Sequence, residues 1–481
     1  MAKESVTETL LQKQKHKEED IEANKVTDGD GAVTLVLLLS TFTALCSTFS
    51  YGIAAGFTSP VQTGMMSGLN LSLAEFSFFG SVLTIGGLIG ALLSGKLADL
   101  FGRRGGLLFS NILCFIGWIT IAFSKDVWSL CTGRLFTGIA AGIVSYLAPV
   151  YIVEIAPTNI RGSLCAINTI MMSSGACFSF LVGSIISWEY LALASTVPCI
   201  LELVSLIFTL ESPRWLSRIG RIKESEATLQ RLRGNKTDIF KEAAEIKKYM
   251  EDVQGTKEDG FFELFNRRYS RVIIVGIGLL VLQQLGGLSG YMFYMSYIFE
   301  KSGFSSKVGV MATSLIQSVM SVVSLLVIDK YGRRPLLMVT TVMMGMGSAL
   351  TGLSFLFQGY DLFNNVSPGL AFTGVQVFLM SISIGMGGIP WVIISEMTPI
   401  NIKGSAGTLC NLISWSSNWF VSYTFNFLFQ WSSSGVFFIY AIISGLGLLF
   451  VARMVPETQG RSLEELQASL SRQSNHKEPS G

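Results

Sequence analysis

Long apolar stretches separated by short polar segments dominate this sequence. A bilayer core about 30 Å thick is crossed by roughly 20 apolar residues in a helix. Twelve stretches of this kind lie near 32–56, 76–95, 105–123, 127–150, 164–186, 190–210, 272–299, 308–328, 335–356, 369–394, 404–428 and 434–454. Because backbone polar groups in lipid must be satisfied within their own segment, each stretch is expected to be a helix. The pattern therefore predicts an all-α polytopic membrane protein with twelve transmembrane helices.

The composition agrees with this class and excludes several others. Hydrophobic residues make up 50% of the 481 residues and charged residues only 14%, whereas about a quarter of a soluble domain is charged. All seven cysteines fall in apolar stretches without metal-type spacing, and both histidines, His16 and His476, lie in the tails. We therefore expect no metal site, no cofactor, no hydrolytic centre and no nucleic-acid partner, so the protein is not expected to be an enzyme.

The distribution of basic residues predicts the orientation of the helices. Translocated short loops carry few lysines and arginines. If both termini face the cytoplasm, the outer loops contain only Lys125, Lys301 and Lys307 of the 35 basic residues. An odd number of spans would spoil this bias, so the charge count supports twelve helices and two cytoplasmic termini.

A small charged segment occurs twice, each time between two long apolar stretches. Asp99–Arg104 reads DLFGRR, and Asp329–Arg334 reads DKYGRR. A second pair follows in the same order, EIAPTNIRGS from Glu154 and EMTPINIKGS from Glu396, and a weaker third pair is Glu211-Ser212 with Glu457-Thr458. Three ordered pairs predict two related halves of six helices that move about a site between them.

These repeats define the expected organisation of the chain. It comprises a cytoplasmic tail (1–31), a first six-helix bundle (32–210), a helical cytoplasmic insert (211–271), a second six-helix bundle (272–454) and a cytoplasmic C-terminal tail (455–481).

Several motifs resemble the sugar porter family of the major facilitator superfamily. They are the two GRR segments, ESPRWL at 211–216, QQLGGLSG at 283–290, GGIPW at 387–391 and PETQGRSLEEL at 456–466. FSYGIAAGFTSPVQTGM and QQLGGLSGYMFY are similar to the plant branch named for early response to dehydration. The resemblance covers nearly the whole chain outside the tails. It implies the major facilitator fold, a monosaccharide substrate, a lipid bilayer environment and function as a monomer.

The resemblance also implies a charge network that ties the inner helix ends together while the sugar site faces outward. Its members are Asp99, Arg103, Arg104, Glu154, Arg161 and Glu211 in one half, and Asp329, Arg333, Arg334, Glu396, Lys403 and Glu457 in the other. Lys403 replaces the more usual arginine and lacks its planar fork. The alternative is that these arginines only anchor the topology at the membrane interface.

A sugar site is expected near the midplane, where hydroxyls need amide and hydroxyl partners and an apolar ring. The resemblance assigns sugar contact to Gln283, Gln284, Trp391 and Asn418, and glycines 286, 287 and 290 allow the seventh helix to bend. Four positions depart from the family pattern: Ser289 and Gln317 replace asparagines, Thr169 replaces glutamine, and Ser383 replaces the glutamate of many animal relatives. We expect weaker or broader monosaccharide binding. The alternative is that each glutamine only joins neighbouring helices.

The mode of coupling depends on three residues. Proton-driven members of the family carry a first-helix aspartate that pairs with the fourth-helix arginine, whereas here Gly52 stands at that place and Arg134 lacks the partner. This favours facilitated diffusion. Glu202, deep in the sixth helix, is the alternative proton site, since a carboxylate in the bilayer is costly; it is equally compatible with a neutral or arginine-paired packed acid. A non-transporting sugar receptor is the third and least favoured hypothesis.

Two local features bear on modification and location. Asn70-Leu71-Ser72 is an N-glycosylation sequon in the first outer loop, which makes Asn70 a candidate site close to the bilayer. Leu10-Leu11 after Glu8 matches a sorting signal for an internal membrane but is more simply a chance apolar pair. The expected location is the vacuolar membrane or the plasma membrane.

Overall fold

The computed structural model describes residues 34–234, 237–255, 264, 269–328, 330–360, 365–398 and 402–458. The N-terminal tail, Asp329 and most of the C-terminal tail lie outside these ranges, so the expectations for them are not addressed by the structure. Every regular element within the described ranges is helical.

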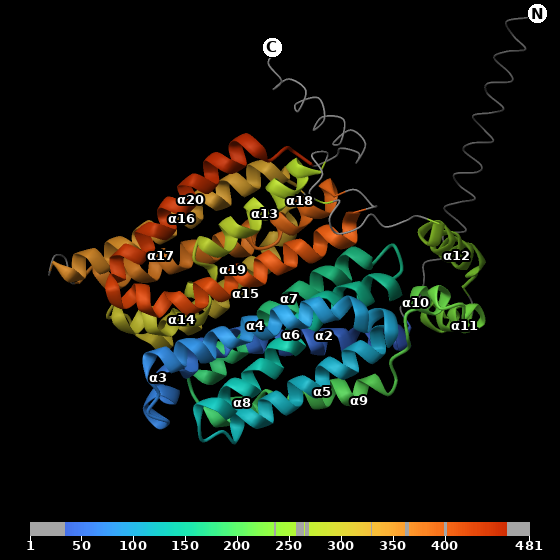
Figure 1. Cartoon of the computed structure of the whole chain (residues 1–481), viewed down its shortest axis with the longest axis horizontal. Coiled ribbons are helices and arrows are strands. Elements are labelled where there is room, and N and C mark those ends of the chain that lie inside the picture. The colour runs from blue at the N-terminus through green and yellow to red at the C-terminus, as the bar shows by residue number, and fades with distance from the viewer. Residues whose placement is uncertain are drawn as a thin grey trace, which may run out of the picture.

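Two groups of helices and a small insert follow one another along the chain (Figure 1). The first group comprises α2 (Leu35–Gly56), α3 (Thr58–Gly68), α4 (Leu73–Leu100), α5 (Gly102–Ala122), α6 (Val127–Ile155), α7 (Arg161–Gly183), α8 (Trp188–Ala194) and α9 (Thr196–Leu206). The insert comprises α10 (Pro213–Arg218), α11 (Ile222–Arg233) and α12 (Phe240–Gly255). The second group comprises α13 (Ser270–Leu285), α14 (Leu288–Lys301), α15 (Ser306–Ile328), α16 (Arg333–Gly359), α17 (Ser367–Ser381), the π-helical turn η2 (Ile382–Met386), α18 (Ile389–Met397), α19 (Lys403–Trp431) and α20 (Ser433–Met454).

The helices agree with the predicted membrane spans. Among the described residues, 11 helical segments are long and apolar enough to cross a membrane, three of them built from consecutive shorter helices. The remaining long helix, α19, has 29 residues, and its serines and asparagines make it less apolar than the other spans. It corresponds to the predicted stretch 404–428 and completes the twelve-helix fold.

Close glycine contacts hold the first group together. The helices α4 and α6 pack along one another, as do α2 and α7. A Cβ atom at Gly90 would lie 2.1 Å from the carbonyl oxygen of Ile139, and one at Gly175 would lie 2.1 Å from the carbonyl oxygen of Phe49. Small residues let helix backbones approach closely in lipid, where the hydrophobic effect gives helices little reason to associate. The first half is therefore packed backbone against backbone.

The second group contains two broken helices. As the glycines predict, the seventh membrane span breaks at Gly286-Gly287, where Gly287 has φ +104°. The tenth span was predicted as one helix over 369–394, but the structure divides it into α17, η2 and α18. Pro390 lies in the first turn of α18 and has no backbone N–H to continue the preceding helix.

The two halves meet through α4 with α19 and α7 with α15, and near one end through α3 with α14 (Figure 1). At the α3–α14 end, the hydroxyls of Ser59 and Ser296 lie 3.0 Å apart, and Thr63 donates to Glu300 at 3.2 Å. Further along, Asn426 donates to Ser77 at 2.8 Å. This end of the molecule is closed by direct contacts between the halves.

The insert is attached to the first half. Arg233 is buried and donates to the carbonyl oxygen of Ile155 at the end of α6, at 2.7 Å, while two of its nitrogens bind the carboxylate of Glu242 in α12. Thr34, which caps the start of α2, donates to the carbonyl oxygen of Leu232 at 2.9 Å. The helices α10–α12 therefore mark the opposite end of the bundle from α3 and α14.

The glycine contacts give a direct test of packing within one helix. Gly90→Ala should lower the free energy of unfolding by about 1–3 kcal/mol, because the new methyl group meets the backbone of α6. Gly95→Ala, in the same helix with no atom within 4 Å of the added carbon, is the matched control and should leave stability unchanged or slightly raised. Thermal unfolding in detergent measures both, and equal midpoints for the two variants would contradict the packing argument.

Candidate functional site

A polar cluster joins three helices of the second half. Gln284 at the end of α13 donates to Ser414 of α19 at 3.5 Å, and its carbonyl oxygen accepts from Ser289 of α14 at 3.3 Å. The Ser289 hydroxyl also lies 2.6 Å from the amide oxygen of Asn418. The break at Gly286-Gly287 brings Ser289 next to Gln284 although the two belong to different helices. The structure thus assembles Gln284, Ser289 and Asn418 into one group.

The other expected sugar contacts make different interactions. Gln283 is buried and donates to the carbonyl oxygens of Met386 and Gly387. The amide of Gln317 lies 3.9 Å from the sulfur of Met292. Trp391 packs against a small apolar group formed with Leu280, Ile394 and Cys410. Thr169 is exposed on α7, and its hydroxyl donates to the carbonyl oxygen of Cys165.

Sequence reasoning missed two residues of this cluster. Ser414 precedes Asn418 by one helical turn, and Trp415 precedes it by three residues, so both lie on its side of α19. The Trp415 ring reaches the first half: a Cβ atom at Gly87 of α4 would lie 2.3 Å from it. The i, i+3 and i+4 spacing around Asn418 is the signal that would have identified both residues.

The repeated charged segment has a clear physical basis in the first half. Glu211 accepts hydrogen bonds from the backbone N–H groups of Arg103 at 2.8 Å and Arg104 at 3.1 Å, in the first turn of α5. A helix N-terminus leaves such N–H groups unpaired and favours a negative charge. Gly102 has φ +75°, and a Cβ atom there would lie 2.4 Å from the Glu211 carboxylate. The glycine of the repeat therefore makes room for the acid.

The second half repeats this arrangement. Glu457 accepts from the backbone N–H groups of Arg333 at 3.0 Å and Arg334 at 3.2 Å, at the start of α16. A Cβ atom at Gly332 would lie 2.6 Å from the Glu457 carboxylate. The weak third pair of the sequence repeat, Glu211 and Glu457, is thus a pair of equivalent helix caps.

The arginine side chains connect the same helix ends to acids in the last turns of α6 and α18. Arg103 forms an ion pair with Glu154 at 2.8 Å, and Arg333 lies 3.7 Å from Glu396. Asp99 pairs with Arg218 of the insert, which the sequence did not suggest. Two of these pairs lie in the first half and its insert, and the third lies in the second half. None of the three connects one half to the other.

Three members of the expected network have other surroundings or are only partly described. The guanidinium of Arg161 lies 3.4 Å from the carbonyl oxygen of Ala156, and that of Arg334 donates to the carbonyl oxygen of Ala452 at 2.5 Å. Lys403 is the first residue of α19, and its side chain is outside the described set.

Glu211 is the titratable centre of the first cap. Burial raises the pKa of its carboxyl above the ordinary value, and the N–H groups of Ser212, Arg103 and Arg104 oppose that rise. A buried carboxylate with several N–H donors remains costly to charge but is strongly oriented.

Arg134 is fully buried, and among the described residues no ion pair joins it to an acid. Its guanidinium donates to Thr58 and lies 5.6 Å and 5.3 Å from the ring centroids of Phe57 and Phe79. In the part of the chain that the structure describes, its Nε and Nη1 atoms have no hydrogen-bond partner. At Gly52 an added Cβ atom would lie 2.0 Å from the carbonyl oxygen of Met172. The helices α2 and α7 can therefore approach this closely only because position 52 has no side chain.

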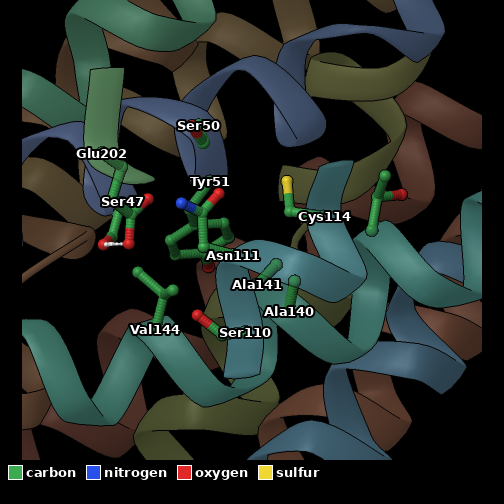
Figure 2. A pocket seen from close by; sticks show the side chains of 11 residues that line it. Ser47, Ser50, Tyr51, Ser110, Asn111, Cys114, Ala140, Ala141, Val144 and Glu202 are labelled. Carbon is green, nitrogen blue, oxygen red and sulfur yellow. Dashed lines mark hydrogen bonds between the residues drawn. The ribbon is translucent and has the colours of Figure 1, made fainter. Parts of the chain in front are cut away.

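Glu202 lies beside a small cavity in the first half. Ser47 donates to its carboxylate at 2.5 Å, and the Glu202 side chain is buried. The cavity has a volume of about 10 Å³, roughly the space of one water molecule. Figure 2 shows the polar side chains of Asn111 and Ser110 on the far side of this space from Glu202.

Asn70, the candidate glycosylation residue, is exposed with φ 51° in the turn between α3 and α4. The sequon residue Ser72 caps α4: its hydroxyl accepts from the N–H of Glu75 and donates to the Glu75 carboxylate at 2.7 Å. The sequon is therefore folded into a helix cap.

Comparisons with known proteins agree with these features. The model of the family described as "Sugar (and other) transporter" matches residues 36–470. The chain is 69% identical over 452 residues to a putative sugar transporter ERD6-like 13 of Arabidopsis thaliana, covering 94% of this chain and 93% of that protein. It is 44% identical over 438 residues to the Arabidopsis sugar transporter ESL1, covering 91% and 93%.

Solved structures show the same fold. The xylose transporter XylE of E. coli, in a partially occluded inward open conformation, matches with a TM-score of 0.75 at 24% identity over 89% of this chain and all of that one. XylE bound to 6-bromo-6-deoxy-D-glucose matches with a TM-score of 0.69 at 26% identity, over 90% and 98%. With its twelve helices, paired helix caps and full-length family match, this chain belongs to the sugar transporter family of the major facilitator superfamily, in the ERD6-like branch, and is an integral multi-pass membrane protein.

Proposed function

We propose that the protein carries monosaccharides across a membrane by alternating access and facilitated diffusion. The cluster of Gln284, Ser289, Ser414 and Asn418 carries this proposal. Amides and hydroxyls both donate and accept hydrogen bonds, which suits the hydroxyl groups of a sugar. Trp415 adds an aromatic face between the halves, and stacking on such a face suits a sugar ring.

The contacts between the halves fit one of the two states that alternating access requires. The halves touch at the α3–α14 end through Ser59, Thr63, Ser296 and Glu300. We therefore propose that this state is closed at the α3–α14 end and open toward the insert. With both termini in the cytoplasm, as the basic residues predict, that opening faces inward.

The proposal includes the remaining features of the family that the chain shares. The bundles 32–210 and 272–454 rock about the cluster, and the segment 211–271 forms the cytoplasmic insert. A single chain contains both halves of the site, so we propose that the monomer is functional. The vacuolar membrane and the plasma membrane both fit the sequence.

The cluster predicts a specific defect in transport. Gln284→Ala removes two donors and one acceptor and should lower kcat/KM for the transported sugar by about 10- to 100-fold, the loss of one or two hydrogen bonds. Uptake of labelled hexoses and pentoses into transport-deficient cells measures this effect. Gln376→Ala is the control, since Gln376 is equally buried but bonds to Thr313 outside the cluster. Wild-type transport by the Gln284 variant would remove the cluster from the site.

Facilitated diffusion rests on the surroundings of Gly52 and Arg134. No titratable side chain stands at position 52, and the adjacent backbone of α7 fills the space that one would need. Arg134 is held by a hydroxyl and two aromatic rings instead of an acid. A guanidinium keeps its charge throughout the physiological range, so it does not carry a proton in a transport cycle.

A proton-coupled symporter is the second candidate, and Glu202 favours it. This acid is buried within the membrane-spanning part, accepts a hydrogen bond from Ser47 and adjoins a cavity of about 10 Å³. Ionisable residues in such places are often proton sites. The cavity would hold a single water beside the carboxylate.

Coupling is tested by comparing accumulation with exchange. We expect the wild type to equilibrate sugar without accumulating it, with little response to a pH gradient or an uncoupler. Glu202→Gln keeps the shape of the side chain and should leave both exchange and net uptake within about twofold of wild type, as expected for a surviving packing role. Accumulation by the wild type that collapses both with an uncoupler and in Glu202→Gln would establish the symporter instead.

We further propose that the charge network braces each half as a unit during the transport cycle. Its pairs and caps connect the ends of α5, α6 and α9 in one half and of α16, α18 and α20 in the other. The expected lock, which breaks when the carrier opens inward, stays the alternative prediction for these contacts. Both ion pairs are present while the α3–α14 end is closed.

The cap that Glu211 forms on α5 predicts a loss of stability when its carboxylate is removed. Glu211→Ala leaves the N–H groups of Arg103 and Arg104 without their acceptor and should cost about 1–3 kcal/mol of stability. Glu211→Gln keeps an acceptor oxygen and should lose less than half of that amount. Thermal unfolding of the two purified variants measures the difference. Equal losses would mean that charge, and not the cap, is what matters at this position.

A further inference from the structure

The break between α17 and α18 leaves two backbone carbonyl groups without their helical partners. In an α-helix the carbonyl oxygen of Met386 would accept from the N–H of residue 390, but Pro390 has none. The carbonyl oxygen of Gly387 would accept from Trp391, but the Trp391 N–H bonds to Gly388 at 3.1 Å instead. Both groups lie within a membrane span, where an unpaired carbonyl is costly.

One side chain satisfies both carbonyls. The Nε2 atom of Gln283 donates to Met386 at 2.8 Å and to Gly387 at 3.0 Å, which uses its two amide hydrogens. Gln283 is only 3% exposed, so water does not easily replace it. A third carbonyl oxygen, that of Ile384, loses its helical partner because the N–H of Gly388 bonds to Gly385 instead. Ser324 of α15 donates to this oxygen at 3.2 Å.

We propose that Gln283 is a positioning residue that holds the bend between α17 and α18, and that it links this bend to the sugar cluster through its neighbour Gln284. The inference rests on the proposed function for the meaning of that cluster. Both amide hydrogens of Gln283 are used at the break, so only its side-chain carbonyl oxygen is left to accept from a sugar hydroxyl. Gln284, the next residue of α13, belongs to the cluster itself.

The position of the break makes this link mechanically useful. The short helix α18 runs from the break to Glu396, which lies beside Arg333 in the charge network. A change in the bend therefore moves one anchored end of the second half relative to the cluster. A sugar that shifts α13 by contact with Gln284 also shifts the amide that holds the two carbonyls. Binding and bending then depend on the same pair of adjacent glutamines.

The proposal is tested by removing the donor and by restoring the missing backbone N–H. Gln283→Met keeps the length of the side chain without its hydrogens. Pro390→Ala supplies an N–H that can reach Met386, so the double variant should tolerate the loss of Gln283 better. We expect Gln283→Met to lower the maximal transport rate about tenfold in the wild-type background but about threefold or less with Pro390→Ala, the size of one hydrogen bond.

Hydrogen–deuterium exchange of the purified protein provides a measurement that does not depend on transport. Peptides covering 382–392 should exchange about tenfold faster in Gln283→Met, and the increase should shrink in the double variant. Gln284→Ala is the matched control, expected to change KM without faster exchange at the break. Unchanged exchange with a pure rise in KM in Gln283→Met would overturn the proposal and make Gln283 a sugar contact alone.

The same experiments separate this inference from the proposed function. Equal loss in both Pro390 backgrounds would overturn the link between Gln283 and the break, even if monosaccharides are transported. Absence of monosaccharide transport by the wild type would overturn the proposed function, while the exchange measurements would still decide whether Gln283 holds the break.

Discussion

Every backbone N–H and carbonyl group within the bilayer needs a partner, and this requirement shapes the structure wherever a helix ends or bends. Along a continuous helix the backbone satisfies itself. At the starts of α5 and α16 the partners are the carboxylates of Glu211 and Glu457, and at the break before α18 they are the side chains of Gln283 and Ser324. At these places polar side chains take over the role of the missing backbone partners.

The same requirement is met in two ways. Glycines such as Gly90 and Gly175 in the first half and Gly347 in the second bring helices into backbone contact. In the second half, Gly287 and Pro390 also interrupt two helices, and the side-chain amide of Gln283 replaces lost backbone bonds at the second break. Each half can therefore move as a unit while it keeps its hydrogen bonds. The proposed sugar cluster lies at one of these bends, where Gln284 and Ser289 face each other across Gly286-Gly287.

Much of this arrangement was predictable from local patterns. Apolar length gave the membrane spans, the repeated GRR segments gave the two halves, and Gly286-Gly287 gave the bend in the seventh span. The partners of individual side chains were less predictable, because they depend on contacts between segments far apart in the chain. Glu211 was expected to meet arginine side chains, and the structure places backbone N–H groups of Arg103 and Arg104 against its carboxylate; Asp99 pairs with Arg218 of the insert. Gln283 was expected to bind sugar, yet its donors bind the carbonyl oxygens of Met386 and Gly387, which lack their helical partners because of Pro390 and the turn of the Trp391 N–H to Gly388.

Gly52 illustrates why a single position is a poor guide to coupling. The sequence alone suggests that an acid has been replaced by a residue without a side chain and that restoring the acid restores a proton site. In the structure the backbone of Met172 occupies the direction in which any side chain would point. An aspartate at this position would have to separate α2 from α7, and the strain would mask any gain in proton binding. Arg134 has partners of a different kind, with Thr58 and the rings of Phe57 and Phe79 around its charge. The absence of the acid and the close contact of α2 with α7 are therefore one structural feature, because any side chain at position 52 requires α2 and α7 to move apart.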